Sequence, residues 1–233
     1  MAQRSTLAVF VMALSLCLLP PALSKAGVSE EARVQAATAI MREIMDIPEC
    51  AIPPSLLRSA QGIAIFPDLL KAGFIFGGRY GVGVLLVRNE DRSWGNPVFF
   101  RLIGGSFGWQ IGVQSTDAIL VLNTIRSMDA MCGGKFTLGG DASIAAGPLG
   151  RQAEAATDIL LRAEIYSYSR NRGLFLGLSL EGAAIQVDYG ATASFYNAPG
   201  LLPMDILRKP NMIMTPPAVA VELRRVLDWY STH

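Results

Sequence analysis

From Gly62 onward the sequence consists of short apolar runs interrupted by glycine, asparagine and aspartate, and this pattern constrains the fold more than any other feature. Runs of this kind predict β-strands. The spacers are too short for the crossovers that parallel strands need, so we expect a mainly antiparallel sheet. Glycine inside a strand permits bulges and corners, so the sheet should be bent and partly barrel-like. The predicted strands are residues 62–66, 72–78, 81–88, 98–103, 105–113, 118–122, 136–146, 163–168 and 174–185.

A helix is expected on each side of this strand-rich region. Residues 28–47 carry Ser29 as an N-cap and stop at Pro48. The apolar face of this helix either packs on a core or lies on a membrane. Its polar face carries two arginines and four carboxylates, and this net negative charge would be repelled by anionic lipid. Core packing is therefore favoured. A helix is also expected after Pro217, and a short one after Thr124. We therefore predict a single α+β domain with a bent, mainly antiparallel, Gly-rich β-sheet flanked by N-terminal and C-terminal helices.

Residues 1–26 have the layout of a secretory signal peptide: Arg4, then an apolar stretch, then small residues around Ala26. The apolar centre of about 13 residues is short for a membrane span of about 20, which favours a cleaved leader over an anchor. Cleavage is expected after Ala26. The protein is therefore expected to be exported, periplasmic or secreted, with its domain in residues 27–233.

Two cysteines remain once the leader is removed, Cys50 and Cys132. Export would place them where a disulfide can persist. A Cys50–Cys132 disulfide and a pair of free buried thiols are equally compatible with the sequence.

Histidine is nearly missing from this sequence, because His233 is its single histidine and its last residue. Histidine-based triads, proton shuttles and His-rich metal sites are therefore nearly excluded, and we expect neither an enzyme nor a cofactor. The formal net charge is +1, so no overall field would attract a nucleic acid.

Two glycine-rich motifs resemble catalytic or phosphate-binding signatures. Residues 104–108 fit G-x-S-x-G, but a nucleophile elbow needs a following helix and a downstream histidine as base. Residues 78–83 look suited to phosphate, yet the apolar residues 84–87 continue a strand where a P-loop would open a helix. Both motifs are interpreted as glycines inside strands.

Four blocks of the sequence resemble the SYLF-domain lipid-binding family, in the order in which that family carries them. They include IPPSLLRSAQGIAIFPDLLKAGFIFGGRYGVGVLLVR, WGNPVFFRLIGGSFG and SYSRNRGLFLGLSLEG, and they span roughly residues 52–196. The resemblance implies a non-enzymatic module that binds phospholipid or phosphoinositide-like head groups. Eukaryotic members are associated with phosphoinositide membranes, and fungal members also with actin. For an exported bacterial member, the expected partner is anionic phospholipid or a membrane surface of the cell envelope, and actin is not expected.

A module of this kind needs an apolar groove or surface rimmed by lysine and arginine that can pair with head-group phosphate. The candidate lipid-binding residues are Lys71, Arg79, Lys135 and Arg151. Six aromatic side chains either supply apolar contacts or fill the core: Phe74, Phe76, Phe99, Phe100, Phe107 and Trp109. The alternative function is a structural or protein-interaction domain of the periplasm, with incidental lipid binding, whose sheet edges or C-terminal helix dock a protein partner.

Overall fold

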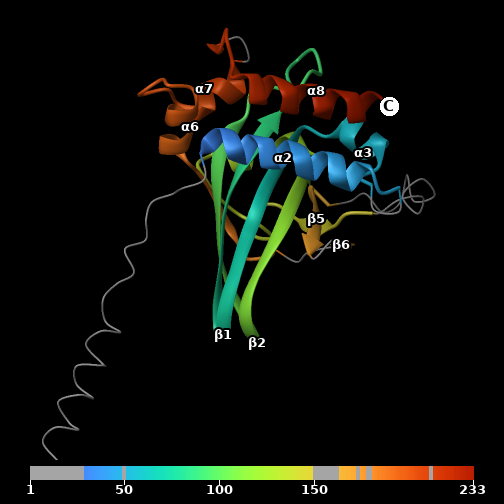
Figure 1. Ribbon diagram of the computed structural model, residues 1–233, viewed down its shortest axis with the longest axis vertical. Helices are drawn as coiled ribbons and strands as arrows, with labels where there is room; N and C mark the ends of the chain where they lie inside the picture. The colour runs from blue at the N-terminus through green and yellow to red at the C-terminus, as the bar shows by residue number, and fades with distance from the viewer. Residues whose placement is uncertain (1–28, 49–50, 149–162, 172–173, 177–179, 210–211) are drawn as a thin grey trace, which may run out of the picture.

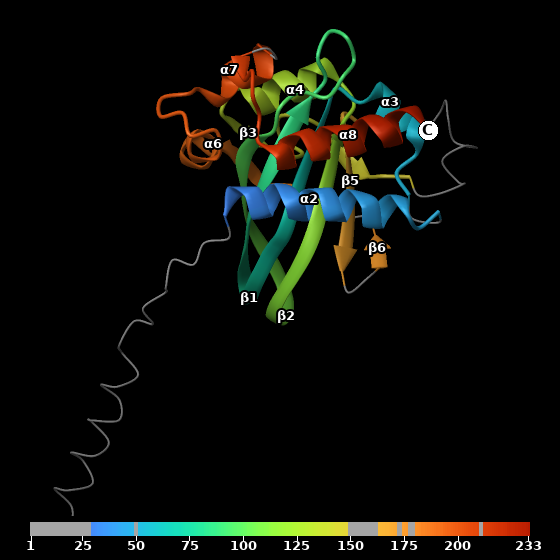
Figure 2. The same cartoon turned by 45° about the horizontal axis from the view of Figure 1, so that its top comes forward.

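The computed structural model describes residues 29–48, 51–148, 163–171, 174–176, 180–209 and 212–233. A curled, half-barrel sheet forms the centre of the molecule, and helices pack on both of its faces (Figures 1 and 2). The helices are α2 (Glu30–Met45), α3 (Pro54–Ser59), α4 (Ile125–Cys132), α6 (Tyr189–Phe195), α7 (Pro203–Arg208) and α8 (Ala218–Thr232). The strands are β1 (Gly62–Val87), β2 (Val98–Leu122), β3 (Lys135–Thr137), β4 (Ile144–Ala146), β5 (Ile165–Asn171), β6 (Leu174–Leu176) and β7 (Ala184–Val187). The predicted α+β class is confirmed.

Strand β2 organises the sheet. It pairs with β1 along most of its length, and on its other side it pairs with β7 near its start and with β5 near its end. Strand β3 extends the sheet beyond β7, while β4 and β6 both pair with β5. Every described strand pair is antiparallel except β4 with β5, so the prediction of a mainly antiparallel sheet is confirmed.

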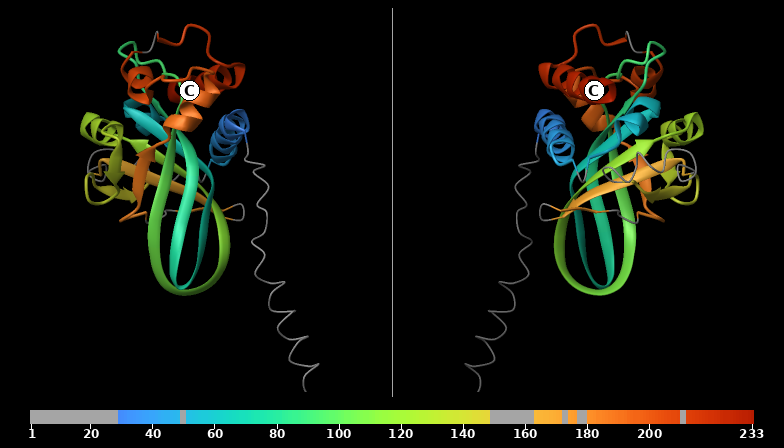
Figure 3. Two further views of the ribbon diagram at one scale, coloured as in Figure 1. Left: turned by 90° about the vertical axis from the view of Figure 1, so that its left-hand side faces the viewer. Right: turned by 90° about the vertical axis from the view of Figure 1, so that its right-hand side faces the viewer.

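Strands β1 and β2 form a long ribbon that is bent back on itself, as Figure 3 shows. The two ends of β1 meet, because the Arg88 amide donates to the Gln61 carbonyl at 2.9 Å. A Cβ added to Gly83 would lie 2.3 Å from the carbonyl oxygen of Ile65, so only glycine permits this close approach. The six separate strands expected between residues 62 and 122 are therefore two continuous ones, since glycine bends each strand without ending it.

Alternation along the strands produces a separate core on each face of the sheet. Ile63, Ile65 and Val84 face a first core built with α2, α3, α6 and α8. Ala64 and Leu85 face a second core, built with α4, α7, β3 and β7. Helix α2 buries the side chains of Val34, Ala37, Ile40, Met41 and Ile44, so its predicted role in core packing is confirmed.

The helix ends follow the local sequence signals closely. Ser29 Oγ accepts from the Ala32 amide at 3.2 Å at the start of α2, and Thr124 Oγ1 accepts from the Ser127 amide at 3.1 Å at the start of α4. Helix α8 begins directly after Pro217. None of the helices in the described ranges is both long and apolar enough to cross a membrane.

Two expectations for the later part of the chain are wrong in detail, and two short helices there were not expected. The predicted strand 136–146 is interrupted, because Gly139 has a φ of +81° and a turn separates β3 from β4. The predicted strand 174–185 is likewise divided into β6 and β7, with Gly182 at a φ of +77° in the turn before β7. Helices α6 and α7 were not expected, because with seven and six residues they are too short to show a helical repeat.

Candidate functional site

The bent end of the β1–β2 ribbon extends beyond the helices that cover the rest of the sheet (Figures 1 and 3). Four large apolar side chains on this part of the ribbon are exposed: Leu70 at 43%, Tyr80 at 49%, Ile103 at 42% and Val113 at 71%. We call these four side chains the ribbon surface. Large apolar side chains that gather on one exposed element are typical of a contact site for a protein or a membrane.

The strand register places the ribbon surface on one face of the sheet. Tyr80 and Ile103 are direct cross-strand partners, and cross-strand partners point to the same face. Tyr80 lies two residues before Val82, which packs against the first core, so it shares that face. Leu70 and Val113 follow the same alternation. Leu70 pairs with Ser115, and Ser115 lies two residues after Val113 on β2, so Leu70 and Val113 point to the same face. The ribbon surface therefore continues the first core beyond the area that the helices cover.

Lys71 and Arg79 lie on the opposite face of the same part of the ribbon. Lys71 follows Leu69 by two residues, and Leu69 belongs to the second core. Arg79 pairs with Gly104, two residues after Leu102 of that core. Both cationic side chains are half-buried. The bent ribbon is thus amphipathic, with apolar side chains on one face and cationic side chains on the other.

The other two predicted lipid-binding residues are placed differently. Lys135 is exposed at the start of β3, where it pairs with Gln186 of β7, which in turn pairs with Arg101. Lys135, Gln186 and Arg101 form a cross-strand row on the sheet face opposite the one that carries Lys71. The row lies at the β3 edge of the sheet. Arg151 lies outside the described residues. Of the three predicted residues that the structure describes, Lys71 and Arg79 share one face of the ribbon and Lys135 does not.

The aromatic candidates divide between core residues and positions whose side chains are not described. Phe99 and Phe100 are fully buried, one in each core, so their interpretation as core residues is confirmed. The side chains of Phe74, Phe76, Phe107 and Trp109 lie outside the description, although the backbone places these residues at the bent end of the ribbon.

The predicted cysteine pair is described at one of its two positions. Cys132 is a buried thiol in the second core, 3.9 Å from the sulfur of Met128. Burial, with a smaller contribution from the charge of Asp129, raises the pKa of this thiol to about 11. Cys50 lies outside the described residues, so a disulfide between the two stays a prediction.

A charged network ties the base of the ribbon to helix α2. Asp68, in the β1 bulge with a φ of 52°, accepts from Ser115 Oγ at 3.1 Å, and its amide donates to Asp117 Oδ1 at 3.1 Å. Arg170 of β5 donates to Asp117 Oδ2 at 2.9 Å and also pairs with Glu43 of α2. Burial raises the pKa of Asp117. This network was not predicted from the sequence, because its charges come from four separate elements.

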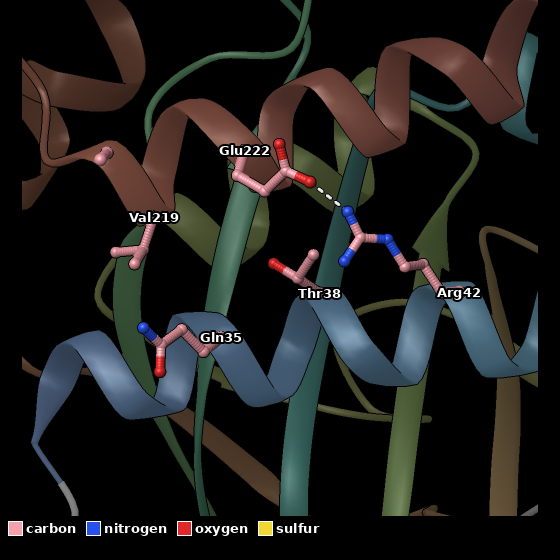
Figure 4. A pocket seen from close by; sticks show the side chains of 6 residues that line it. Gln35, Thr38, Arg42, Val219 and Glu222 are labelled. Carbon is pink, nitrogen blue, oxygen red and sulfur yellow. Dashed lines mark hydrogen bonds and ion pairs between the residues drawn. The ribbon is translucent and has the colours of Figure 1, made fainter.

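A groove of about 350 Å³ runs between α2 and α8 (Figure 4). The side chains of Gln35 and Thr38 face Val219 across it, and Arg42 of α2 forms an ion pair with Glu222 of α8. A second hollow of about 280 Å³ adjoins Arg42 on its other side and is lined by Arg225, Val226, Trp229 and Tyr230. These hollows lie on the helical layer, and neither is lined by Lys71 or Arg79.

Neither glycine-rich motif forms the site that its pattern resembles. Residues 104–108 lie inside β2 opposite residues 75–79, so no nucleophile elbow is present there. Residues 78–83 lie inside β1, which continues as strand to Val87. His233 stacks on Trp229 at the exposed C-terminus with ring centroids 3.7 Å apart. Among the described residues, no three His, Cys, Asp or Glu side chains are grouped to hold a metal ion.

Comparisons with known proteins identify relatives across most of the chain. The family described as "Las17-binding protein actin regulator" (Ysc84) matches residues 103–230. The chain is 40% identical over 182 residues to LAS seventeen-binding protein 3 of Saccharomyces cerevisiae, covering 76% of this chain and 38% of that protein. It is 34% identical over 201 residues to SH3 domain-containing YSC84-like protein 1 of Bos taurus, covering 84% of this chain and 58% of that protein. The chain thus spans less than two thirds of the length of these relatives.

Proposed function

Since this chain belongs to the Ysc84 family of Las17-binding protein actin regulators, whose domain is the SYLF domain, we propose that it is a non-enzymatic module that binds anionic phospholipid at a membrane surface. The observation that carries the proposal is the amphipathic bent end of the ribbon, with four exposed apolar side chains on one face and Lys71 and Arg79 on the other. Apolar area combined with cationic side chains is the combination that interfacial membrane binding uses.

The charge of the ribbon supports an anionic partner. No Asp or Glu occurs in residues 69–87 or 98–116, whereas Lys71, Arg79 and Arg101 occur there. A lysine or arginine close to an anionic membrane contributes roughly 1 kcal/mol, and salt weakens this attraction. Binding should therefore require anionic lipid and decrease at high ionic strength. With the predicted leader, the proposed location is the bacterial cell envelope, either periplasmic or secreted.

Vesicle co-sedimentation tests the proposal with a protein that begins at Gly27. The two described core clusters use side chains from Val34 to Leu227, so this protein retains both of them. We expect it to sediment with vesicles that contain phosphatidylglycerol or cardiolipin at low salt, and much less with phosphatidylcholine alone. The absence of sedimentation with every vesicle would refute the proposal.

A pair of double variants tests which cations are used. Lys71→Gln with Arg79→Gln should remove most of the salt-sensitive binding. Lys135→Gln with Arg151→Gln removes the same number of charges from the other two predicted positions, and only a smaller loss is expected. Thermal unfolding of both variants shows whether each is folded. Equal losses from the two folded variants would contradict the assignment of the ribbon.

A protein-interaction domain is the second candidate function. The relatives are named for Las17 binding, and the family description names actin regulation, so a protein partner is a natural alternative. The groove between α2 and α8 favours this candidate, because it offers apolar lining together with Arg42 and Glu222. If no vesicle is bound, this groove becomes the surface to test with protein partners.

A further inference from the structure

We infer that the bent end of the ribbon inserts its apolar surface into the interfacial layer of a phospholipid bilayer, with Leu70, Tyr80, Ile103 and Val113 below the head groups. This inference rests on the proposed lipid-binding function and deepens it, because it names the inserted element and the depth that the element reaches. It assigns the contact to the sheet, whereas the N-terminal helix α2 is occupied with the first core.

The shape of this surface favours a bilayer over a single enclosed lipid. The four side chains belong to the ribbon, whose bent end extends beyond the helices (Figure 1). The hollows described above lie between α2 and α8 instead, and Lys71 and Arg79 line neither of them. An element with one apolar face that extends beyond the rest of the molecule can bury that face at the head-group and acyl boundary of a bilayer.

The distribution of charged residues along the ribbon also favours a phospholipid bilayer as the partner. The ribbon carries no carboxylate between residues 69 and 87 or between residues 98 and 116, so no acidic group would have to enter the head-group layer. The nearest acids, Asp68 and Asp117, stand at the base of the ribbon. Arg170 also stands at this base and binds Asp117. The acidic side chains therefore mark the level at which insertion has to stop.

The hydrogen bonding of β2 limits the depth of insertion. Its described partners on the side away from β1 are β7 at Phe100–Ile103 and β5 at Asp117–Leu122. No strand in the described part of the chain pairs with residues 104–116 on that side. Backbone groups that lack a strand partner need water or head groups, which the hydrocarbon centre of a bilayer does not supply. The ribbon therefore enters the interface and does not cross the membrane.

A fluorescent label at Val113 tests the insertion directly. Val113 is 71% exposed, so Val113→Cys carries an environment-sensitive nitrobenzoxadiazole label without disturbing the core. The matched control is Glu90→Cys in the exposed hairpin loop at the opposite end of the ribbon. Both variants are made in the protein that begins at Gly27 and carries Cys50→Ser, which leaves the buried Cys132 as its one native cysteine. The vesicles contain phosphatidylglycerol and phosphatidylcholine, with or without brominated acyl chains.

We expect the label at position 113 to shift to the blue and to be quenched by brominated chains, while the label at position 90 stays in water. A Val113→Asp variant should reduce vesicle partitioning by at least about tenfold, because it places a charge where the inserted surface carries an apolar side chain. If the protein sediments with vesicles but neither label is quenched, the insertion is refuted and the lipid-binding function stands. If the protein binds no vesicle, both fail together.

Discussion

The close return of β1 upon itself predicts a large effect of the smallest substitution at Gly83. In Gly83→Ala the new Cβ would stand 2.3 Å from the Ile65 carbonyl oxygen and 2.5 Å from Phe66 Cδ1, whereas ordinary contact begins at 3.4 Å. Ile65 and Phe66 are fully buried in opposite cores, so neither can move away without disturbing the packing of its own core. The two limbs of β1 must therefore separate by about 1 Å.

The magnitude follows from two opposing terms. Overpacking a well-filled core costs about 1–3 kcal/mol, and a clash with backbone belongs at the upper end of that range. Alanine also lowers the conformational entropy of the unfolded chain, which offsets about 0.4–1 kcal/mol of this destabilisation. The free energy of unfolding should therefore fall by about 2 kcal/mol. For a chain of this size, that corresponds to a decrease in Tm of roughly 4–8 °C.

Thermal unfolding followed by circular dichroism measures this difference. The matched control is Gly105→Ala in β2, where an added Cβ meets no atom within 4 Å and should leave Tm unchanged or slightly higher. Equal Tm values for the two variants would refute the argument that the limbs of β1 lie in contact at Gly83.

Three further predictions concern other parts of the fold. Arg88 Cζ lies 3.8 Å from the centroid of the Trp94 ring, and the Arg88 guanidinium donates to Ser231 Oγ at 2.6 Å. Lysine cannot keep both contacts, so Arg88→Lys should lower the free energy of unfolding by about 2 kcal/mol, as measured by urea titration. An unchanged urea midpoint would contradict this prediction. Cys132 keeps its proton in the folded protein up to a pKa of about 11, while the unfolded thiol loses it near 9, so stability should fall as pH rises through that window. Part of this fall should disappear in Cys132→Ala; identical pH dependence would show that the thiol does not contribute. Arg42 and Glu222 form an exposed ion pair, so Arg42→Ala should change the free energy of unfolding by less than about 1 kcal/mol. A decrease in Tm that corresponds to more than about 1 kcal/mol would contradict the interpretation of this pair as a weak surface contact.

Local sequence signals predicted those parts of the fold that short stretches of chain determine. Ser29 and Thr124 cap the helices as their positions indicate, and α8 starts after Pro217. The mainly antiparallel, bent sheet also followed from glycine within strands and from short spacers. These features depend on neighbours within a few residues, so one sequence suffices to infer them.

Features that depend on distant contacts were not predicted. A glycine inside an apolar run is compatible with a turn or with a bend, and the structure shows that β1 continues as one strand from Gly62 to Val87. The contact between Gly83 and Ile65 then shows how closely the two limbs of this strand approach each other. The ribbon surface was missed for a similar reason, because Tyr80, Ile103 and Val113 alternate with their neighbours as core residues would. How far the helices extend over the sheet determines which of these side chains stay uncovered. Lys71 was singled out because it lies beside a Gly-rich strand, and the structure places both Lys71 and Arg79 on β1; their role in lipid binding stays a prediction.

Hydrogen exchange, measured on the protein from Gly27 with and without phosphatidylglycerol vesicles, tests the central claim most directly, because it compares the two candidate surfaces in a single experiment. The account predicts that backbone amides in residues 69–81 and 103–115 exchange more slowly when vesicles are present, while amides of α8 are unchanged. Slower exchange along α2 and α8, with no change in the ribbon, would contradict it and would identify the groove between those helices as the lipid-contact surface.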